Sequence, residues 1–201
     1  MMKRILFTFA VVALAIYAGA ATAQQLSLAQ ISQYLNQLET AQGRFTQVNP
    51  DGSQIAGTIY IKRPGRIRFE YDPPERSMVI AGGGQLAVFD PRSNTGPDRY
   101  PLNQTPLNVI LQRDVNLERA RMVTGQSYDG TYTTVTARDP DNAEYGAIQL
   151  VFSANPIALR QWVITDDIGT RTTVVLGDLV TGGRIGDILF NIRAEMRKWG
   201  N

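Results

Sequence analysis

The sequence predicts a mainly β fold in which an antiparallel meander curls into a barrel or half-barrel. Short apolar or alternating runs follow one another between residues 44 and 177, and turn residues such as Asn49-Pro50-Asp51-Gly52 separate them. Most of these runs have no helix-length connection between them, which is typical of antiparallel pairing. No internal repeat or linker interrupts the 201 residues, so we expect a single domain over residues 24–201.

Residues 1–23 have the layout of a secretory signal peptide. Lys3 and Arg4 precede an uncharged apolar run, and a stretch of small residues ends at Ala23. We therefore expect export, with cleavage after Ala23. Cleavage removes two of the 20 basic side chains and none of the 18 acidic ones, so the formal charge of +2 is lost. Gln24 follows, not the cysteine that carries a lipoprotein's lipid, so we expect a released protein.

Composition excludes several classes of function. Without cysteine the chain has no disulfide scaffold or thiol nucleophile, and without histidine it lacks the usual general base and metal ligand. Asp166 and Asp167 lie in a sequence typical of a hairpin turn, and Asp139 and Asp141 lack the rest of a calcium loop. Residues 82–84 are three glycines without the lysine of a phosphate loop, which predicts a hairpin. We expect no enzyme, catalytic residue, metal or cofactor.

Residues 27–41 are the long segment with helical periodicity. Its apolar stripe consists of Leu28, Ile31, Leu35 and Leu38, with Tyr34 beside it. Ser27 and Gln30 have the spacing of a capping box, which predicts where the helix begins. Gly43 offers a stop.

Eleven segments are strand candidates, because they are short, apolar or alternating, and bounded by turn residues. They are residues 44–48, 54–62, 66–71, 77–81, 85–89, 121–127, 131–137, 147–153, 160–165, 171–177 and 187–192. Residues 90–120 interrupt the meander, and a long insertion of this kind is commonly a lid or a binding loop. We expect a short helix there, capped by Thr105 and starting at Pro106.

Alternation singles out Arg63. Side chains of a strand point to opposite faces in turn, so Ile59, Ile61 and Arg63 share one face. If the isoleucines face the interior, the guanidinium does too, where it needs carbonyl or carboxylate partners. Alternatively, Arg63 reaches solvent at the strand end before Pro64, and the pattern leaves both interpretations open.

The next strand alternates between an apolar and a charged face. The apolar face carries Ile67, Phe69 and Tyr71, and the charged face carries Arg66, Arg68 and Glu70. Glu70 interleaves with the arginines and the charge of the exported chain is balanced, so we expect an exposed face with ion pairs and no nucleic-acid partner. Periodicity does not decide whether the other, concave face encloses a ligand cavity or packs as an ordinary core.

Several stretches, in order along the chain, carry a resemblance to a known family. They are Phe45-Thr46-Gln47, residues 57–64 with 68–71, Pro106-Leu107 to Leu111, Leu150 to Leu159, and Trp162 to Val174. In them the chain resembles the LolA family of periplasmic outer-membrane lipoprotein carriers. The succession F-T-Q, K-R-P and P-L-x-x-I-L is fairly specific, and the stretches together span nearly all of the expected domain.

The resemblance implies an incomplete antiparallel β-barrel of about eleven strands with a helical lid over an apolar cavity. It also implies a non-enzymatic, monomeric periplasmic chaperone that binds the acyl chains of lipoproteins. Its partners would be acylated lipoproteins, an inner-membrane lipoprotein-releasing ABC transporter and an outer-membrane acceptor. The alternatives are a general periplasmic lipid-binding protein or an envelope-stress sensor on the same scaffold.

The resemblance further implies roles for particular residues. Arg63 matches the arginine of the K-R-P motif, which in the family hydrogen-bonds to the lid helices and holds the empty carrier closed. The acyl-chain cavity and lid then comprise Leu35, Leu38, Phe45, Ile59, Ile61, Phe69, Tyr71, Leu107 and Ile110. The C-terminal residues 190–201 depart from the proline-containing strand and polar tail common in the family.

Overall fold

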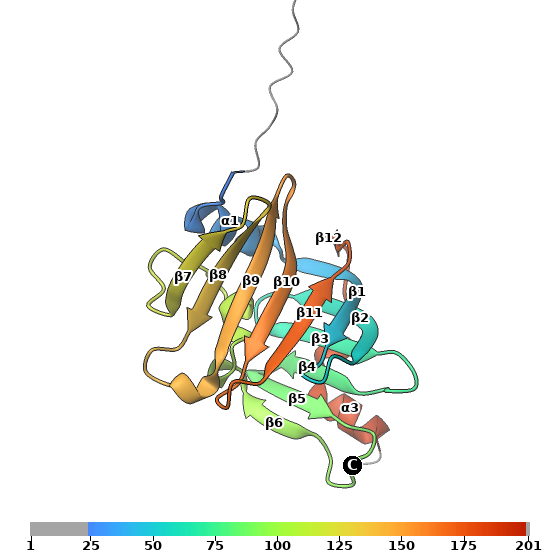
Figure 1. Ribbon diagram of the computed structural model, residues 1–201. Coiled ribbons are helices and arrows are strands. Elements are labelled where there is room, and N and C mark those ends of the chain that lie inside the picture. Colours follow the sequence, from blue (N-terminus) through green and yellow to red (C-terminus); the bar gives the residue numbers. More distant parts are fainter. Residues whose placement is uncertain (1–23, 200–201) are drawn as a thin grey trace, which may run out of the picture.

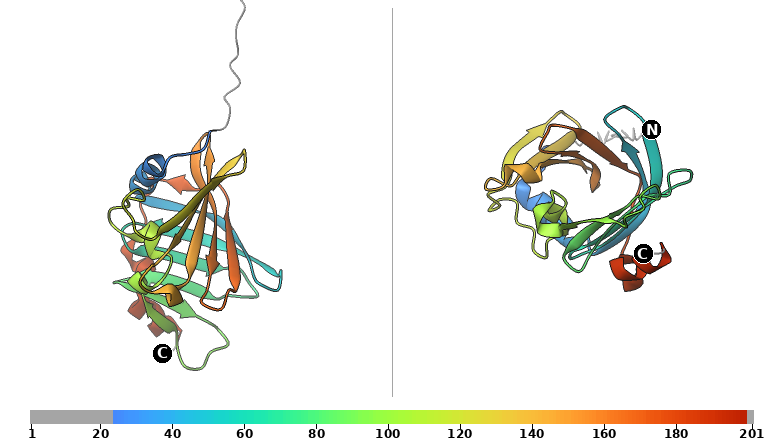
Figure 2. Two further views of the ribbon diagram at one scale, coloured as in Figure 1. Left: turned by 60° about the vertical axis from the view of Figure 1, so that its left-hand side comes forward. Right: turned by 90° about the horizontal axis from the view of Figure 1, so that it is seen from below.

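The computed structural model describes residues 24–199, so the predicted signal peptide lies outside the described residues. A single antiparallel 12-stranded sheet curves around a hydrophobic core in the order β6-β5-β4-β3-β2-β1-β11-β10-β9-β8-β7, with β12 paired to β1 (Figure 1). The end strands β6 and β7 are not paired with each other. The predicted incomplete barrel is therefore confirmed, and Figure 2 shows it from the side and from below.

The strands are β1 Thr40–Val48, β2 Gln54–Lys62, β3 Arg66–Tyr71, β4 Met78–Gly82, β5 Gln85–Phe89, β6 Asp98–Pro101, β7 Val123–Tyr128, β8 Tyr132–Arg138, β9 Ala147–Ala154, β10 Ile157–Thr165, β11 Arg171–Leu176 and β12 Val180–Thr181. The helices are α1 Leu28–Gln37, α2 Asn108–Leu111 and α3 Ile192–Lys198, and three short 3₁₀ turns are η1 Leu102–Gln104, η2 Ala143–Tyr145 and η3 Asp187–Phe190. The first ten predicted strands all exist, several with shifted ends.

Helix α1 begins as predicted and ends early. The Ser27 side chain accepts from the Gln30 N–H at 3.2 Å, and the Gln30 side chain accepts from the Ser27 N–H at 2.9 Å, which is the capping box. Gly43, predicted as the helix stop, lies within β1 opposite Ile59. A Cβ atom at Gly43 would lie 2.8 Å from the Asp178 carbonyl oxygen, so this glycine permits a close approach of the C-terminal segment instead.

Residues 102–122, here called the lid segment, connect the two unpaired edge strands. They leave β6, form η1 and α2, and enter β7, so this connection spans the side on which the barrel is open. The predicted Thr105 cap is wrong, because the Thr105 hydroxyl donates to the Leu102 carbonyl at 2.8 Å and α2 begins later, at Asn108. Strand β6 within the predicted insertion was not foreseen, since all four of its side chains are exposed and carry no apolar alternation.

The predicted strand over residues 187–192 is wrong, because this stretch forms η3 and the start of α3. The Asn191 side chain accepts from the Ala194 N–H at 2.9 Å and caps the helix. Ile192, Met196 and Trp199 then pack on a small outer cluster of Ile80, Ala87 and Phe89. Figure 2 shows α3 lying on the outside of the barrel.

The prediction of an exposed charged face on β3 is also wrong for Arg68, which is only 4% exposed. Its Nη1 donates to the Leu189 carbonyl at 2.9 Å and pairs with the Glu195 carboxylate at 3.1 Å, while its Nε pairs with Glu70 at 2.6 Å. The C-terminal segment covers this face. Arg68 was expected to be exposed, and it forms instead a buried ion pair with Glu195, which is 127 positions away in the chain.

Candidate functional site

Arg63 lies directly after β2 and is buried, with 9% of its surface exposed. Its guanidinium therefore follows Ile59 and Ile61 into the interior and does not reach solvent at the strand end. Its Nη2 donates to the Gln112 carbonyl at 2.7 Å, to the Arg113 carbonyl at 3.2 Å and to Asn36 Oδ1 at 3.3 Å. One cation thus connects the end of β2 with both α1 and the lid segment.

The surroundings of Arg63 satisfy its charge only in part. Burial lowers the pKa of the Arg63 guanidinium, and the nearby Asp114 carboxylate opposes that shift. Its Nε is buried and has no hydrogen-bond partner. An unsatisfied buried donor costs free energy, which offsets part of what the three Nη2 hydrogen bonds contribute.

Asn36 is the second residue at this junction. Its Nδ2 donates to the Val115 carbonyl at 2.9 Å, and its Oδ1 accepts from the Val115 N–H at 2.9 Å. One turn earlier on α1, Ser32 Oγ accepts from the Leu117 N–H at 2.9 Å. Both hydrogen-bonding groups of Val115 are therefore satisfied by a single side chain of the first helix.

Sequence reasoning missed Ser32 and Asn36. They are four residues apart beside the apolar stripe of α1, a spacing that an exposed polar face has as well. Their partners Val115 and Leu117 lie 79 and 85 positions further along, in a stretch without periodicity. No sequence signal marks this pairing.

The turn between β2 and β3 is hydrogen-bonded to the end of α2. The Gly65 N–H donates to the Leu111 carbonyl at 2.7 Å, next to the two carbonyls that Arg63 holds. Gly65 has a φ of 72°, in the left-handed region that favours glycine. Three successive carbonyls of the lid segment, from Leu111 to Arg113, therefore accept hydrogen bonds from this single turn.

The nine apolar residues predicted for the cavity and lid come together on the concave side of the sheet. Eight of them are buried, with exposed fractions of 0–5%, namely Leu35, Leu38, Phe45, Ile59, Ile61, Phe69, Leu107 and Ile110. Tyr71 is half-buried and packs against the same cluster. In this closed arrangement they contact one another and the helices, so the apolar concave face is filled by its own side chains.

Aromatic rings form the centre of this cluster. The Phe45 ring meets the rings of Phe69 and Tyr71 edge-on at 5.3 and 5.2 Å, and Phe69 meets Trp162 at 6.0 Å. Such pairs add to the stabilisation from burial. The Tyr71 hydroxyl donates to Gln47 Oε1 at 2.6 Å, and burial raises the pKa of that hydroxyl.

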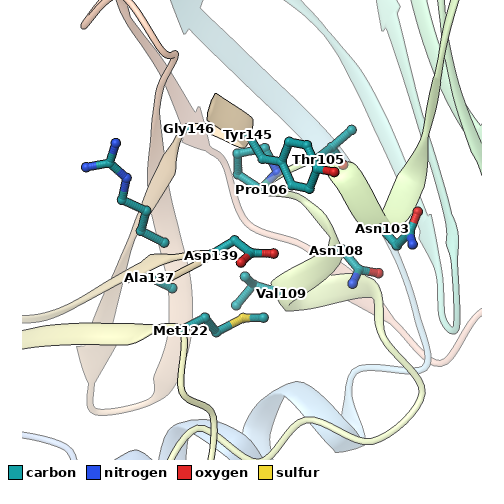
Figure 3. Close-up of a pocket in the computed structure, with 11 residues that line it drawn as sticks. Asn103, Thr105, Pro106, Asn108, Val109, Met122, Ala137, Asp139, Tyr145 and Gly146 are labelled. Carbon is teal, nitrogen blue, oxygen red and sulfur yellow. The ribbon is translucent and has the colours of Figure 1, made fainter. Parts of the chain in front are cut away.

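Surface pockets flank the lid segment. Figure 3 shows a small pocket that Pro106, Val109 and Met122 of the lid segment line together with Ala137 and Tyr145. An adjoining groove of about 520 Å³ has mostly apolar walls, which include Leu86, Tyr100, Pro106, Leu107, Tyr145 and Ile164. Leu107 belongs both to this groove and to the buried cluster, so the two adjoin at this residue.

The acidic candidates form turns. Asp166 Oδ1 accepts from the Ile168 and Thr170 N–H groups at 3.1 and 2.7 Å, and Asp139 Oδ1 accepts from the Asp141 N–H at 2.8 Å. Among residues 24–199, no three carboxylates gather as a metal site would need. No helix in the same range is long and apolar enough to cross a membrane.

Comparison with known proteins decides the family. A family model described as "Outer membrane lipoprotein carrier protein LolA" matches residues 36–193. The chain belongs to the LolA family. LolA proteins are periplasmic carriers and not enzymes, which confirms the expectation that this protein is not an enzyme.

Three carrier proteins of other bacteria agree with this assignment in their sequences. The outer-membrane lipoprotein carrier protein of Coxiella burnetii strain CbuK_Q154 is 24% identical over 184 residues, covering 87% of this chain and 86% of the relative. That of Pseudomonas aeruginosa strain UCBPP-PA14 is 26% identical over 186 residues, with 88% of each covered. That of Coxiella burnetii strain RSA 331 is 30% identical over 134 residues, which is 63% of this chain and 59% of the relative.

A solved LolA superfamily protein from Nitrosomonas europaea is 13% identical with a TM-score of 0.46, covering 83% of this chain and 98% of that one.

Proposed function

We propose that this single-domain protein is a monomeric carrier for acylated lipoproteins, in which Arg63 is the latch that holds the empty carrier closed. It would take cargo from an inner-membrane lipoprotein-releasing ABC transporter and deliver it to an outer-membrane acceptor, after export and cleavage after Ala23. The observation that carries the proposal is that Arg63 Nη2 bonds to both α1 and the lid segment over a filled apolar core.

The chemistry of the concave face fits acyl chains. The buried cluster extends from Phe45 and Phe69 on the sheet to Leu35 on α1 and to Leu107 and Ile110 on the lid segment. With the lid segment and α1 displaced, the same side chains would line a cavity without charge. Tyr71, at the border of the cluster, would lie at the cavity wall.

The free energy of acyl-chain burial explains why a carrier needs a latch. Burial of an acyl chain of about sixteen carbons, at ~0.8 kcal/mol per CH₂, is worth ~12 kcal/mol. Three such chains would exceed the ceiling of roughly 18 to 21 kcal/mol for non-covalent affinity. A carrier must release what it binds, so opening has to cost free energy that offsets part of this gain. Breaking the Arg63 hydrogen bonds on opening supplies such a cost.

Native mass spectrometry of the protein purified from its own periplasm tests this function. If the protein is a carrier, a fraction of the purified molecules should have one acylated lipoprotein bound. Free phospholipid as the sole bound species would instead indicate a general lipid-binding protein. A protein with neither ligand that hydrolyses a lipid or ester would contradict both proposals.

A further inference from the structure

The C-terminal segment builds a polar groove on the outside of the barrel. This groove, of about 560 Å³, lies between β3, the β4–β5 turn, β6 and residues 187–193. Three arginines line it, namely Arg66, Arg99 and Arg193, and its acidic residue is Asp187. It is separate from the lid segment and from Arg63, which do not contribute to its walls.

The charges in this groove do not balance. Lys62 and Arg66 both pair with the Asp187 carboxylate, at 2.6 and 2.7 Å. Arg99 and Arg193 are exposed and form no ion pair with any residue in the described range 24–199. The exported chain as a whole has equal numbers of basic and acidic side chains, so this positive surface is a local feature.

Helix α3 extends the positive surface. Ile192, Met196 and Trp199 face the barrel, so Arg193 and Arg197, which are exposed and one turn apart, lie on the outward side. Figure 2 shows this helix on the outer face of the sheet, open to solvent on its far side. Ile188 follows Asp187 of the groove directly in the chain and is 63% exposed, although it is a large aliphatic residue.

We propose that this outer surface, made by Arg99, Ile188, Arg193 and Arg197, docks on a bilayer surface rich in anionic phospholipids. Arginine binds phosphate with two parallel hydrogen bonds, and basic side chains near an anionic bilayer each add to the attraction. An exposed aliphatic residue among arginines inserts at the boundary between headgroups and acyl chains. Docking through this face leaves the lid segment free to exchange cargo.

An acidic protein partner fits these observations less well. Stable protein interfaces centre on buried aromatic or aliphatic anchors in apolar pockets. The groove is polar, and the aromatic residue of α3, Trp199, already packs on Phe89 at 5.3 Å between ring centroids. What remains exposed is charge and one isoleucine.

Co-flotation of the cargo-free protein with vesicles tests the proposal. We expect binding to vesicles of phosphatidylethanolamine and phosphatidylglycerol, no binding to phosphatidylcholine vesicles, and loss of binding in high salt. Arg99→Gln and Arg193→Gln should each weaken binding about fivefold. Arg171→Gln, which removes an exposed arginine on β11 in the other half of the sheet, is the matched control and should bind as the wild type does.

Ile188→Ser should weaken binding at low salt and leave its salt dependence unchanged, because it removes the apolar contact and no charge. The proposal is overturned if the wild type does not bind anionic vesicles, or if the double variant Arg99→Gln/Arg193→Gln binds them as well as the wild type. It is also overturned if Arg171→Gln loses as much binding as Arg99→Gln or Arg193→Gln. All these measurements use protein without cargo. They therefore stand or fall separately from the carrier function.

Discussion

Arg63 Nη2 lies 2.7 Å from the carbonyl oxygen of Gln112, which joins the end of β2 to a segment 49 positions later in the chain. The same nitrogen reaches Asn36 on α1, so one donor atom contacts both the first helix and the lid segment. Asn36, Ser32 and Gly65 hold the same segment through further hydrogen bonds to Val115, Leu117 and Leu111. Changes at this junction should alter opening more than folding.

Asn36→Ala should loosen the lid segment without unfolding the barrel. The substitution removes the long bond to Arg63 and both neutral bonds to Val115, and the two Val115 bonds together are worth roughly 2 kcal/mol net. We expect amide hydrogen exchange to rise roughly 30-fold at Val115 and also at Leu117, whose bond to Ser32 is untouched. Asn103→Ala, at an exposed asparagine of the same segment, is the control. Unchanged exchange at Leu117 would show that Asn36 does not hold the segment.

Gly57→Ala should destabilise the whole domain. A Cβ atom there would lie 2.3 Å from the Glu70 carbonyl oxygen and 2.6 Å from the Phe45 ring, so strand and ring must both shift. We expect a loss of about 1–3 kcal/mol in the free energy of unfolding, measured with urea. Gly125→Ala adds the same methyl group where no atom lies within 4 Å, and it should change stability by less than about 1 kcal/mol. Equal losses in the two variants would refute this packing argument.

The buried Arg68–Glu195 pair predicts a loss of stability in acid. Burial acts to raise the pKa of the Glu195 carboxyl, but hydrogen bonds from Arg68 and Lys198 outweigh it, and the pKa is lowered from 4.5. The Glu195 carboxyl therefore binds its proton more readily in the unfolded chain than in the folded one. The contribution of the pair to the free energy of unfolding is complete above about pH 4.5 and is lost as the pH falls through the lowered pKa.

Urea unfolding between pH 3 and 7 measures this contribution. Glu195→Gln should lower stability at pH 7 by about 1–3 kcal/mol and flatten the acid limb of the curve. Glu118→Gln, at an exposed glutamate, should leave both the stability and its pH dependence as in the wild type. An acid limb that is as steep in Glu195→Gln as in the wild type would contradict the assignment.

Local patterns predicted the parts of the fold that local physics determines. The capping box at Ser27 and Gln30 and the alternation of residues 54–71 depend on neighbours a few positions apart, and both appear in the structure. The inward direction of Arg63 followed from the same alternation. The pattern of short runs also gave the first ten strands, and the family resemblance added the interpretation of residues 90–120 as part of a helical lid.

Contacts between distant segments were out of reach. Arg68 reads as exposed until residues 185–199 cover it, and that segment has no strand-like or long helical pattern of its own. Asn36 pairs with Val115 through backbone groups that every residue has. Gly43 has the local pattern of a helix stop. The real reason for a glycine there is the close approach of Asp178, which lies far away in the sequence and is not visible in the local pattern.

The transfer rate of Arg63→Leu tests the latch most directly. The leucine places an apolar side chain at this inward position and removes all three Nη2 bonds, so the variant should fold and load lipoprotein. With less free energy returned on closing, it should hold cargo more tightly and transfer it to the purified outer-membrane acceptor at least tenfold more slowly than the wild type. Transfer by Arg63→Leu as fast as by the wild type would contradict the latch.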